Sequence, residues 1–343
     1  MGSPWEPTKA GTKGAQGIKP PFSRSLACGP TCPDQPHTLN LSTTLCDSDS
    51  CSGVEGMRYG VGYKGSKSRV AGDIIRLLPS GKRLIDLFGG GGAIAHCAAE
   101  SGKWGEVIYS DCEPSIVSLC SALFSGEFRS NLALFDWVSR ERFFAEKDNN
   151  AIIRWVWSFG NNGQSYLYGA NIESQKEAIH RAIVDKTYSP IFLELTGGEI
   201  PFYHHGIGER KKDWSMFCRT VLHSVDSYRV PHLERLTNIQ SVNLDLLRCR
   251  IECLFGSYTE YKFREGDIVY CDPPYSGTKC DSYSGFDNAA FWDWARTVPC
   301  YVSEYRAPKD FMPIWQKEIM IQSTSDGNGR KAIERLFKSP ACK

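Results

Sequence analysis

The most specific chemical signal in the chain is the tetrapeptide Asp272-Pro273-Pro274-Tyr275. Proline has no backbone N–H and cannot continue a β-ladder, so two prolines in a row stop a strand and stiffen the following loop. The Asp272 carboxylate and the Pro273 carbonyl are then two acceptors on a rigid frame, which match the two N–H donors of an exocyclic amine. Tyr275 adds a flat ring on which a nucleobase can stack. The pattern indicates chemistry on the amino group of a base; the alternative is a plain strand-ending turn with a surface aspartate.

A glycine-rich segment, Asp86–Gly92, is the second candidate site. Glycines allow positive φ and let the backbone approach a ligand closely. The spacing is neither a dinucleotide fingerprint nor a P-loop, and no cluster of Lys or Arg accompanies it. Asp111 ends the next apolar run, where a doubly wound fold places a carboxylate that binds ribose hydroxyls. An adenosine ligand without phosphates, such as S-adenosylmethionine, fits this pair; a tight turn and a helix N-cap before Pro114 are the alternatives.

The surrounding sequence predicts the elements that position these residues. Short apolar runs typical of buried strands alternate with segments of helical periodicity. The strand-like runs are 83–88, 106–109, 267–271, 300–303 and 318–321. Helices are expected over 69–78, 93–100, 114–124 and 291–295. This alternation predicts an α/β fold with a doubly wound sheet, whose ligands bind at the carboxyl ends of the strands.

Two segments depart from the alternation. Residues 131–250 are aromatic and polar and are expected to be a mostly helical insert between 57–130 and 251–343. Residues 1–56 are rich in Gly, Pro, Ser and Thr without periodicity, which predicts a disordered or non-native tail. Its cysteines have spacings that fit a zinc site only loosely, and incidental thiols are the simpler interpretation. They are Cys28, Cys32, Cys46 and Cys51.

Composition limits the classes of partner. The chain has 343 residues, and its 40 basic and 39 acidic residues give a net charge of +1, so any nucleic-acid surface must be a local patch. Arg210 and Lys211 are candidates for phosphate contacts, or they belong to a solvated loop. No apolar run approaches the roughly 18 residues that span a bilayer, and no secretory signal is apparent. A cytoplasmic location is therefore expected.

The motifs together resemble a known family. Residues 57–338 are similar to the Dam-like (class alpha, D12 type) DNA adenine-N6 methyltransferases, with phage and prophage members looking closest. Tyr63-Lys64-Gly65-Ser66-Lys67 resembles the family's N-terminal cofactor motif, in which an aromatic residue precedes a lysine by four positions. Tyr63 stands where a tryptophan is common. The resemblance implies a Rossmann-like, S-adenosylmethionine-dependent methyltransferase sheet with an inserted target-recognition region.

The resemblance also assigns roles to residues. Phe159–Gly163 faintly resembles a segment that touches DNA, which adds Asn162 and Gly163 to the DNA-binding candidates. The implied catalytic residues are Asp272, Pro273, Pro274 and Tyr275. The implied cofactor-binding residues are Tyr63, Lys67, Asp86, Phe88, Gly89, Gly90, Asp111, Ser257 and Tyr258. The expected chemistry needs no metal.

The function expected from these features is site-specific methylation of adenine N6 in double-stranded DNA, with the target base flipped out of the helix. A monomer or weak dimer in a bacterial or phage-infected cell is expected, and a cognate restriction nuclease is a candidate partner. The alternatives are methylation of RNA adenine or of DNA cytosine N4, and a DNA-binding relative that has lost catalysis. Intact Asp272, Tyr275, Lys67 and Asp111 argue against such a loss.

Overall fold

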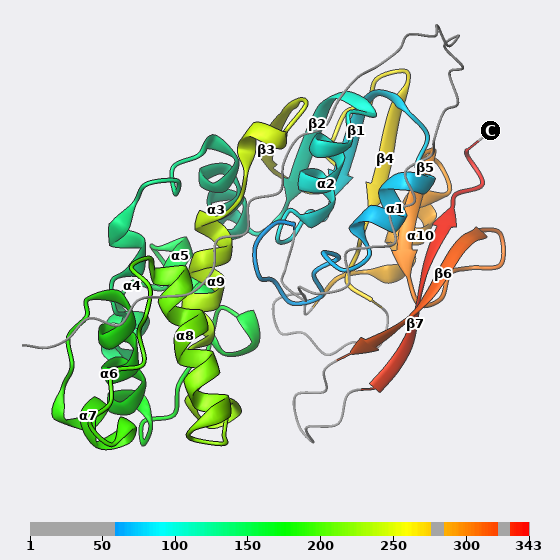
Figure 1. Cartoon of the computed structure of the whole chain (residues 1–343). Coiled ribbons are helices and arrows are strands. Elements are labelled where there is room, and N and C mark those ends of the chain that lie inside the picture. Colours follow the sequence, from blue (N-terminus) through cyan, green and yellow to red (C-terminus); the bar gives the residue numbers. More distant parts are fainter. Residues whose placement is uncertain (1–58, 276–284, 322–329, 343) are drawn as a thin grey trace, which may run out of the picture. The chain divides into compact units, whose positions relative to one another are not determined.

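The structure is a computed structural model that describes residues 59–275, 285–321 and 330–342. The expected tail and its four cysteines lie outside the described residues. Within them, seven strands form one sheet in the order β3-β2-β1-β4-β5-β7-β6 (Figure 1). Their bounds are β1 Gly81–Leu87, β2 Trp104–Asp111, β3 Arg250–Phe255, β4 Asp267–Cys271, β5 Cys300–Glu304, β6 Met312–Ile321 and β7 Arg330–Lys338.

The strand directions define a doubly wound sheet. Strands β1 to β5 are parallel, and β7 runs antiparallel between β5 and β6. Strand β1 pairs with β2 on one side and with β4 on the other, so the winding reverses between β1 and β4. In such sheets ligands bind outside the carboxyl ends of the strands at this reversal. The glycine-rich segment follows β1 and the tetrapeptide follows β4, so the fold brings the two motifs to one edge.

Alternate residues of the central strands face two separate cores. On one face Leu84, Val107 and Tyr270 join a core that includes side chains of α1, α2 and α3. On the other face Ile85 and Val269 join a second core with α10. Burial on both faces explains why these strands are continuous apolar runs. The bounds of the helices are α1 Ala71–Leu77, α2 Ala93–Ser101, α3 Pro114–Ser125 and α10 Asn288–Ala295 (Figure 1).

Most predicted elements of the sheet are confirmed, and the C-terminal hairpin is the main exception. The prediction placed a strand over 318–321, whereas β6 begins at Met312 and pairs with β7 through a register shift between Pro313 and Trp315. Strands β3 and β7 were not predicted. Both mix charged and apolar residues, and β3 is an edge strand while β7 lies next to an edge. Such strands lack the apolar run that marks the central strands.

The segment between α3 and β3 is mostly helical, as predicted. Its helices are α4 Arg140–Glu146, α5 Ala151–Val156, α6 Glu173–Val184, α7 Pro190–Thr196, α8 Ile207–Thr220 and α9 Pro231–Gln240. Trp157, Phe192 and Trp214 are fully buried, so the segment has aromatic core packing of its own. None of the helices in the described ranges is long and apolar enough to cross a bilayer.

A chain of hydrogen bonds runs through the interior of this helical segment. The Tyr168 hydroxyl lies 2.6 Å from His232 Nδ1, and His232 Nε2 lies 2.9 Å from His180 Nδ1. His180 in turn bonds the Phe135 backbone. Each contact is satisfied if Tyr168 donates to a neutral His232, which donates to a neutral His180. Burial lowers the pKa of His180 to about 3 and that of His232 well below its usual range.

This histidine chain predicts a stability that depends on pH. The unfolded state takes up protons near the ordinary histidine pKa of about 6.5, while the folded state does not, so the free energy of unfolding should fall as the pH is lowered below that value. The expected slope is up to about 1.4 kcal/mol per pH unit for each histidine. Urea unfolding followed by tryptophan fluorescence between pH 7.5 and 5 measures it, because the Trp157 ring stacks on His232 at 4.1 Å.

Two variants separate this effect from other titrations. His180→Asn should have a smaller slope than wild type, and His205→Asn, at an exposed position, should keep the wild-type slope. An equal slope in His180→Asn and wild type would contradict the assignment.

Candidate active site

The segment before α1 lies across the glycine-rich loop. The Val61 N–H donates to the Gly91 carbonyl at 2.7 Å, and the Gly60 N–H donates to His96 Nδ1 at 3.1 Å. A Cβ atom at position 91 would lie 2.4 Å from the Val61 carbonyl oxygen, so this crossing requires glycine. The crossing brings Tyr63 to the loop that follows β1.

The remaining loop glycines are also explained by contacts within the protein. A Cβ at Gly89 would meet the Tyr109 ring at 2.3 Å, and one at Gly90 would meet the Tyr63 ring at 2.9 Å. Gly90 has a φ of 48°. Tyr109 further anchors the loop, because its hydroxyl donates to the Gly90 carbonyl at 2.7 Å. The sequence interpretation assigned the glycines to close approach of a ligand, and the structure shows that close packing of the protein itself already requires them.

Asp111, at the end of β2, is built into the same loop. Its Oδ2 accepts from the Gly90 N–H at 2.9 Å and its Oδ1 from the Glu113 N–H at 2.8 Å. Burial raises the pKa of Asp111, and the N–H donors partly offset that effect. The N-cap of α3 is Glu113, so the capping role weighed for Asp111 belongs to another residue. The Gly256 N–H donates to the Asp111 carbonyl at 3.1 Å, which places Ser257 after β3 close to this acid.

Aromatic rings form a wall beside the glycine-rich loop. Phe88 has a φ of 69°, which is uncommon for a residue other than glycine and costs conformational energy. Its ring lies 5.2 Å from that of Tyr258 and 5.6 Å from that of Phe291. Tyr258 also contacts the Trp294 ring at 4.9 Å. The wall presents flat apolar surface at the carboxyl end of β1, where strained residues commonly serve function.

The tetrapeptide leaves β4 directly at the point where the winding reverses. The Asp272 N–H points at the Leu87 carbonyl at 3.4 Å, so the loops after β1 and β4 touch. Lys67 Nζ forms an ion pair with Asp272 Oδ2 at 2.8 Å. Oδ1 of Asp272 is buried and has no hydrogen-bond partner among the described residues. Pro273 is buried behind it.

A residue that the sequence reasoning missed, Glu334 on β7, completes this cluster. Its Oε1 accepts from the Tyr275 hydroxyl and lies 3.8 Å from Lys67 Nζ. The Lys67 ammonium also lies over the Tyr275 ring, 4.7 Å from its centre. The Tyr305 ring contacts that of Tyr275 edge-on at 4.6 Å. Only the strand pairing identifies Glu334, because within the charged sequence of β7 it looks like any surface glutamate.

The electrostatics of the cluster are dominated by burial. Burial raises the pKa values of Asp272 and Glu334, and it raises that of Asp86 well above its usual range. Burial alone would lower the pKa of Lys67, but the Asp272 and Glu334 carboxylates outweigh it and raise the pKa, so Lys67 stays protonated. Three buried carboxyl groups around one ammonium make this edge of the sheet favourable for a bound cation.

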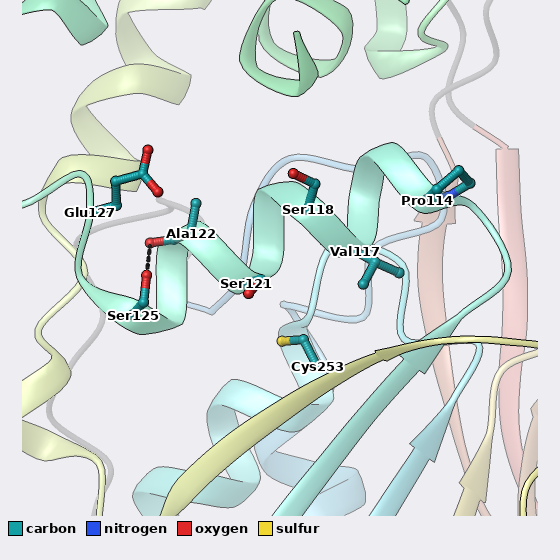
Figure 2. A pocket seen from close by; sticks show the side chains of 8 residues that line it. All are labelled: Pro114, Val117, Ser118, Ser121, Ala122, Ser125, Glu127 and Cys253. Atoms are coloured by element: carbon teal, nitrogen blue, oxygen red, sulfur yellow. Dashed lines mark hydrogen bonds between the residues drawn. The ribbon is translucent and has the colours of Figure 1, made fainter. Parts of the chain in front are cut away.

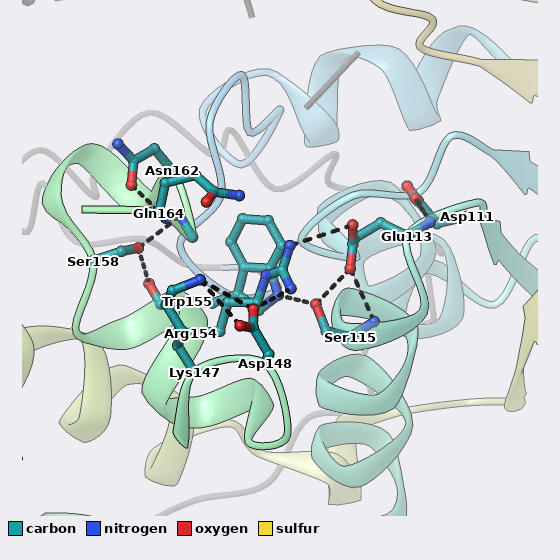
Figure 3. A network of polar contacts seen from close by, with 11 residues as sticks. Asp111, Glu113, Ser115, Lys147, Asp148, Arg154, Trp155, Ser158, Asn162 and Gln164 are labelled. Carbon is teal, nitrogen blue, oxygen red and sulfur yellow. Dashed lines mark hydrogen bonds and ion pairs between the residues drawn. The ribbon is translucent and has the colours of Figure 1, made fainter. Parts of the chain in front are cut away.

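Polar contacts join the helical segment to the residues that follow Asp111 (Figure 3). Trp155 Nε1 donates to Ser115 Oγ at 2.9 Å, and Arg154 pairs with Glu113 at 3.7 Å. The Trp155 ring lies 5.0 Å from the ring of Tyr63. These contacts join α5 to the start of α3, directly after Asp111.

Two of the residues expected to contact DNA are buried. Arg210 is buried, and its guanidinium donates to the carbonyls of Ile183, Val184 and His205, so it holds the helical segment together. Gly163 is buried, with a φ of 68° and with Arg154 packed against it. Both positions are therefore explained by contacts within the helical segment.

The other two DNA candidates lie nearer the surface. Asn162 Oδ1 accepts from the Gln164 and Ser165 N–H groups, which fixes a turn and leaves the amide partly exposed. Lys211 is half-buried and lines a hollow of about 420 Å³ between α8 and α9. The hollow is also lined by the basic residues Lys212, Arg219 and Arg229.

A second hollow of about 420 Å³ lies along α3 (Figure 2). Its lining is small and polar, with Ser118, Ser121 and Ser125 on one helix face and Cys253 of β3 beside them. The residues that line it include none of the predicted site residues. It is therefore distinct from the edge of the sheet at which the motifs meet.

The sequence is similar to those of known DNA adenine methyltransferases. The family described as D12 class N6 adenine-specific DNA methyltransferase matches residues 63–188, which include Tyr63, Lys67, the glycine-rich loop and Asp111. The retron Ec67 DNA adenine methylase of Escherichia coli is 22% identical over 275 residues, covering 80% of each chain. A solved structure of a proposed RNA methyltransferase from Pyrococcus horikoshii covers 80% of this chain and 85% of that one, at 10% identity and a TM-score of 0.33.

The three comparisons differ in weight. The solved structure is too distant to carry an argument, and the doubly wound fold rests on the strand order itself. The family match covers residues 63–188, and the similarity to the retron methylase extends over most of both chains. These matches indicate a D12 class N6 adenine-specific DNA methyltransferase domain over residues 63–188, together with similarity to a DNA adenine methylase over most of the chain.

Proposed function

We propose that the protein transfers a methyl group from S-adenosylmethionine to the N6 amine of a flipped-out adenine, at a specific sequence of double-stranded DNA. The observation that carries the proposal is Asp272 Oδ1, a buried carboxylate oxygen without a hydrogen-bond partner among the described residues. A buried acceptor without a donor costs about 1–3 kcal/mol. An N–H group of a bound base would relieve that cost, and the neighbouring Pro273 carbonyl offers a second acceptor.

The residues at the end of β1 and β2 support S-adenosylmethionine as the methyl donor. Phe88 and Tyr258 present rings suited to an adenine, and Asp111 keeps lone pairs for ribose hydroxyls beside the two N–H groups it already binds. A positively charged ligand would offset the burial of the Asp86 and Asp272 carboxylates. When bound, S-adenosylmethionine supplies a methyl group that its sulfonium sulfur already activates.

The chain's own groups then orient the amine and remove a proton. Asp272 Oδ1 and the Pro273 carbonyl accept the two N6 hydrogens, which weakens conjugation of the nitrogen lone pair with the ring. Tyr275 provides a stacking surface for the base. Asp272, whose pKa burial raises, is the nearest acceptor for the proton that N6 gives up after transfer. Lys67 remains protonated between two carboxylates, so it orients Asp272 and does not act as the base.

We further propose that 57–130 with 251–343 forms the catalytic domain and that 131–250 recognises the DNA sequence. The basic hollow at Lys211 supports this assignment, because lysine and arginine side chains contact phosphates and fix the orientation of a protein on the duplex. Asn162 is the remaining candidate for a polar DNA contact in the turn after α5. A cytoplasmic location and pairing with a restriction nuclease are part of the same proposal, since DNA is the substrate.

Asp272→Asn tests the central residue. The variant keeps the shape of the side chain but loses the negative charge and the acceptor for the released proton, so turnover should fall by at least about 100-fold. The assay is transfer of labelled methyl from S-adenosylmethionine to unmethylated genomic DNA, followed by digestion to nucleosides. Wild type should label N6-methyl-2′-deoxyadenosine, and Asp293→Asn, an exposed acid on α10, should match wild type. Label in RNA or in cytosine, with none in DNA adenine, would overturn the proposal.

Asp111→Asn tests the cofactor assignment. The amide can keep one backbone contact but accepts ribose hydroxyls less strongly, so the dissociation constant for S-adenosylhomocysteine should rise about 10-fold. Isothermal calorimetry measures this constant, with Asp245→Asn as the exposed control. A dissociation constant unchanged from wild type would remove Asp111 from the binding site.

A further inference from the structure

We propose that Glu334 is a positioning residue for methyl transfer. It holds Lys67 and the Tyr275 hydroxyl in place. As a result, the carboxylate of Asp272 and the ring of Tyr275 both face the target base. The inference rests on the proposed function and adds a residue that lies outside both motifs. It makes the C-terminal hairpin part of the active site.

The strand pairing explains how a residue so far along the chain reaches the site. Glu334 pairs with Lys317 on β6, and Leu336, two positions on, pairs with Ser303 on β5. Since alternate residues of a strand share a face, Glu334 faces the same side as the buried Leu336. Ser303 in turn bonds the Tyr270 hydroxyl on β4 at 2.7 Å, next to the tetrapeptide. The hairpin therefore presents Glu334 to the loop after β4.

The partners of Glu334 belong to the active site. With only 2% of its surface exposed, the side chain is almost completely buried, and burying a carboxylate is costly unless it is paired. Its Oε1 accepts from the Tyr275 hydroxyl and lies 3.8 Å from Lys67 Nζ, whereas Asp272 Oδ2 lies 2.8 Å from the same ammonium. Lys67 is thus shared unequally between two carboxylates, with the closer contact to Asp272.

This sharing sets the state of Asp272. If the second carboxylate were absent, the ammonium would be drawn fully to Asp272, which would weaken Asp272 as an acceptor for an amine and as a base. The Glu334 and Asp272 carboxylates also repel each other, and this repulsion adds to burial in raising the pKa of Glu334. The Tyr275 hydroxyl, held by Glu334, fixes the tilt of the ring over Lys67.

The direction of the expected pH effect follows from these charges. Among the described residues, the titratable groups that face Asp272 are Lys67, Asp86, Tyr270, Cys271, Tyr275, Tyr305 and Glu334. Glu304 also faces Glu334. Removing the charge of Glu334 removes one repulsion and strengthens the pull of Lys67, so the pKa of Asp272 should fall. The acidic limb of kcat/KM reports that pKa in the free enzyme and should move to lower pH.

The test is Glu334→Gln, which keeps the size of the side chain and an acceptor for Tyr275 but removes the charge. Methyl transfer to unmethylated genomic DNA is measured from pH 5 to 9 over a range of S-adenosylmethionine concentrations that reaches saturation. We expect kcat to fall about 10- to 100-fold, KM for S-adenosylmethionine to change by less than about 2-fold, and the acidic limb to move down by at least about half a pH unit. Glu318→Gln, an exposed acid on β6, is the matched control and should behave as wild type.

The outcomes separate this inference from the proposed function. If wild type transfers no methyl to DNA adenine, the proposed function fails before Glu334 is considered. If wild type is active and Glu334→Gln has the same kcat and pH profile, the inference is wrong while the proposed function stands. If kcat falls but the acidic limb of the pH profile of kcat/KM does not move, Glu334 has a merely structural role and the inference is also wrong. If Glu334→Gln does not fold, Tyr275→Phe decides, because an unchanged kcat without the hydroxyl would contradict the positioning role.

Discussion

The buried ammonium of Lys67 is the interaction on which the catalytic edge of this protein depends. It joins the segment before α1 to the loop after β4 and to the strand β7. A buried charge without a partner is strongly destabilising, so each of the three parts is constrained by the other two. The ion pairs with Asp272 and Glu334 therefore have two roles. They hold these three parts of the chain together, and they influence the charges of Lys67 and of the two carboxylates at the place where the base would bind.

The helical segment between α3 and β3, which is expected to contact DNA, is also bonded to the start of α3. Trp155 and Arg154 bond residues of the first turn of α3, which begins just after Asp111. The region expected to recognise sequence and the acid expected to bind ribose are thus neighbours through a few side-chain contacts. Its interior is held by the neutral histidine chain and by Arg210, which bonds three backbone carbonyls. Side chains that look suited to a ligand are used here to satisfy buried backbone groups.

Much of the fold could be predicted from the sequence because the central strands are buried on both faces. Continuous apolar runs located β1, β2, β4 and β5 closely, and the two motifs could be assigned to one edge from the rules of doubly wound sheets. Strand β7 could not be found in this way, since its charged residues face solvent or a buried carboxylate site that only strand pairing reveals. Glu334 was missed for the same reason. The burial of Arg210 could not be predicted either, because a charged residue in a polar segment resembles a surface residue.

The glycine-rich loop has a consequence for how this sequence can diverge. Each glycine is opposed by a different neighbour: position 89 by the Tyr109 ring, position 90 by the Tyr63 ring and position 91 by the Val61 carbonyl. The first two are side chains that another residue could replace, whereas the third is backbone and cannot be altered by mutation. Alanine at position 89 should thus appear in relatives only where position 109 has become smaller, while glycine at position 91 has no compensating partner. Although the glycines look equivalent in the sequence, each is required by a different neighbour, and some of these neighbours can change more easily than others.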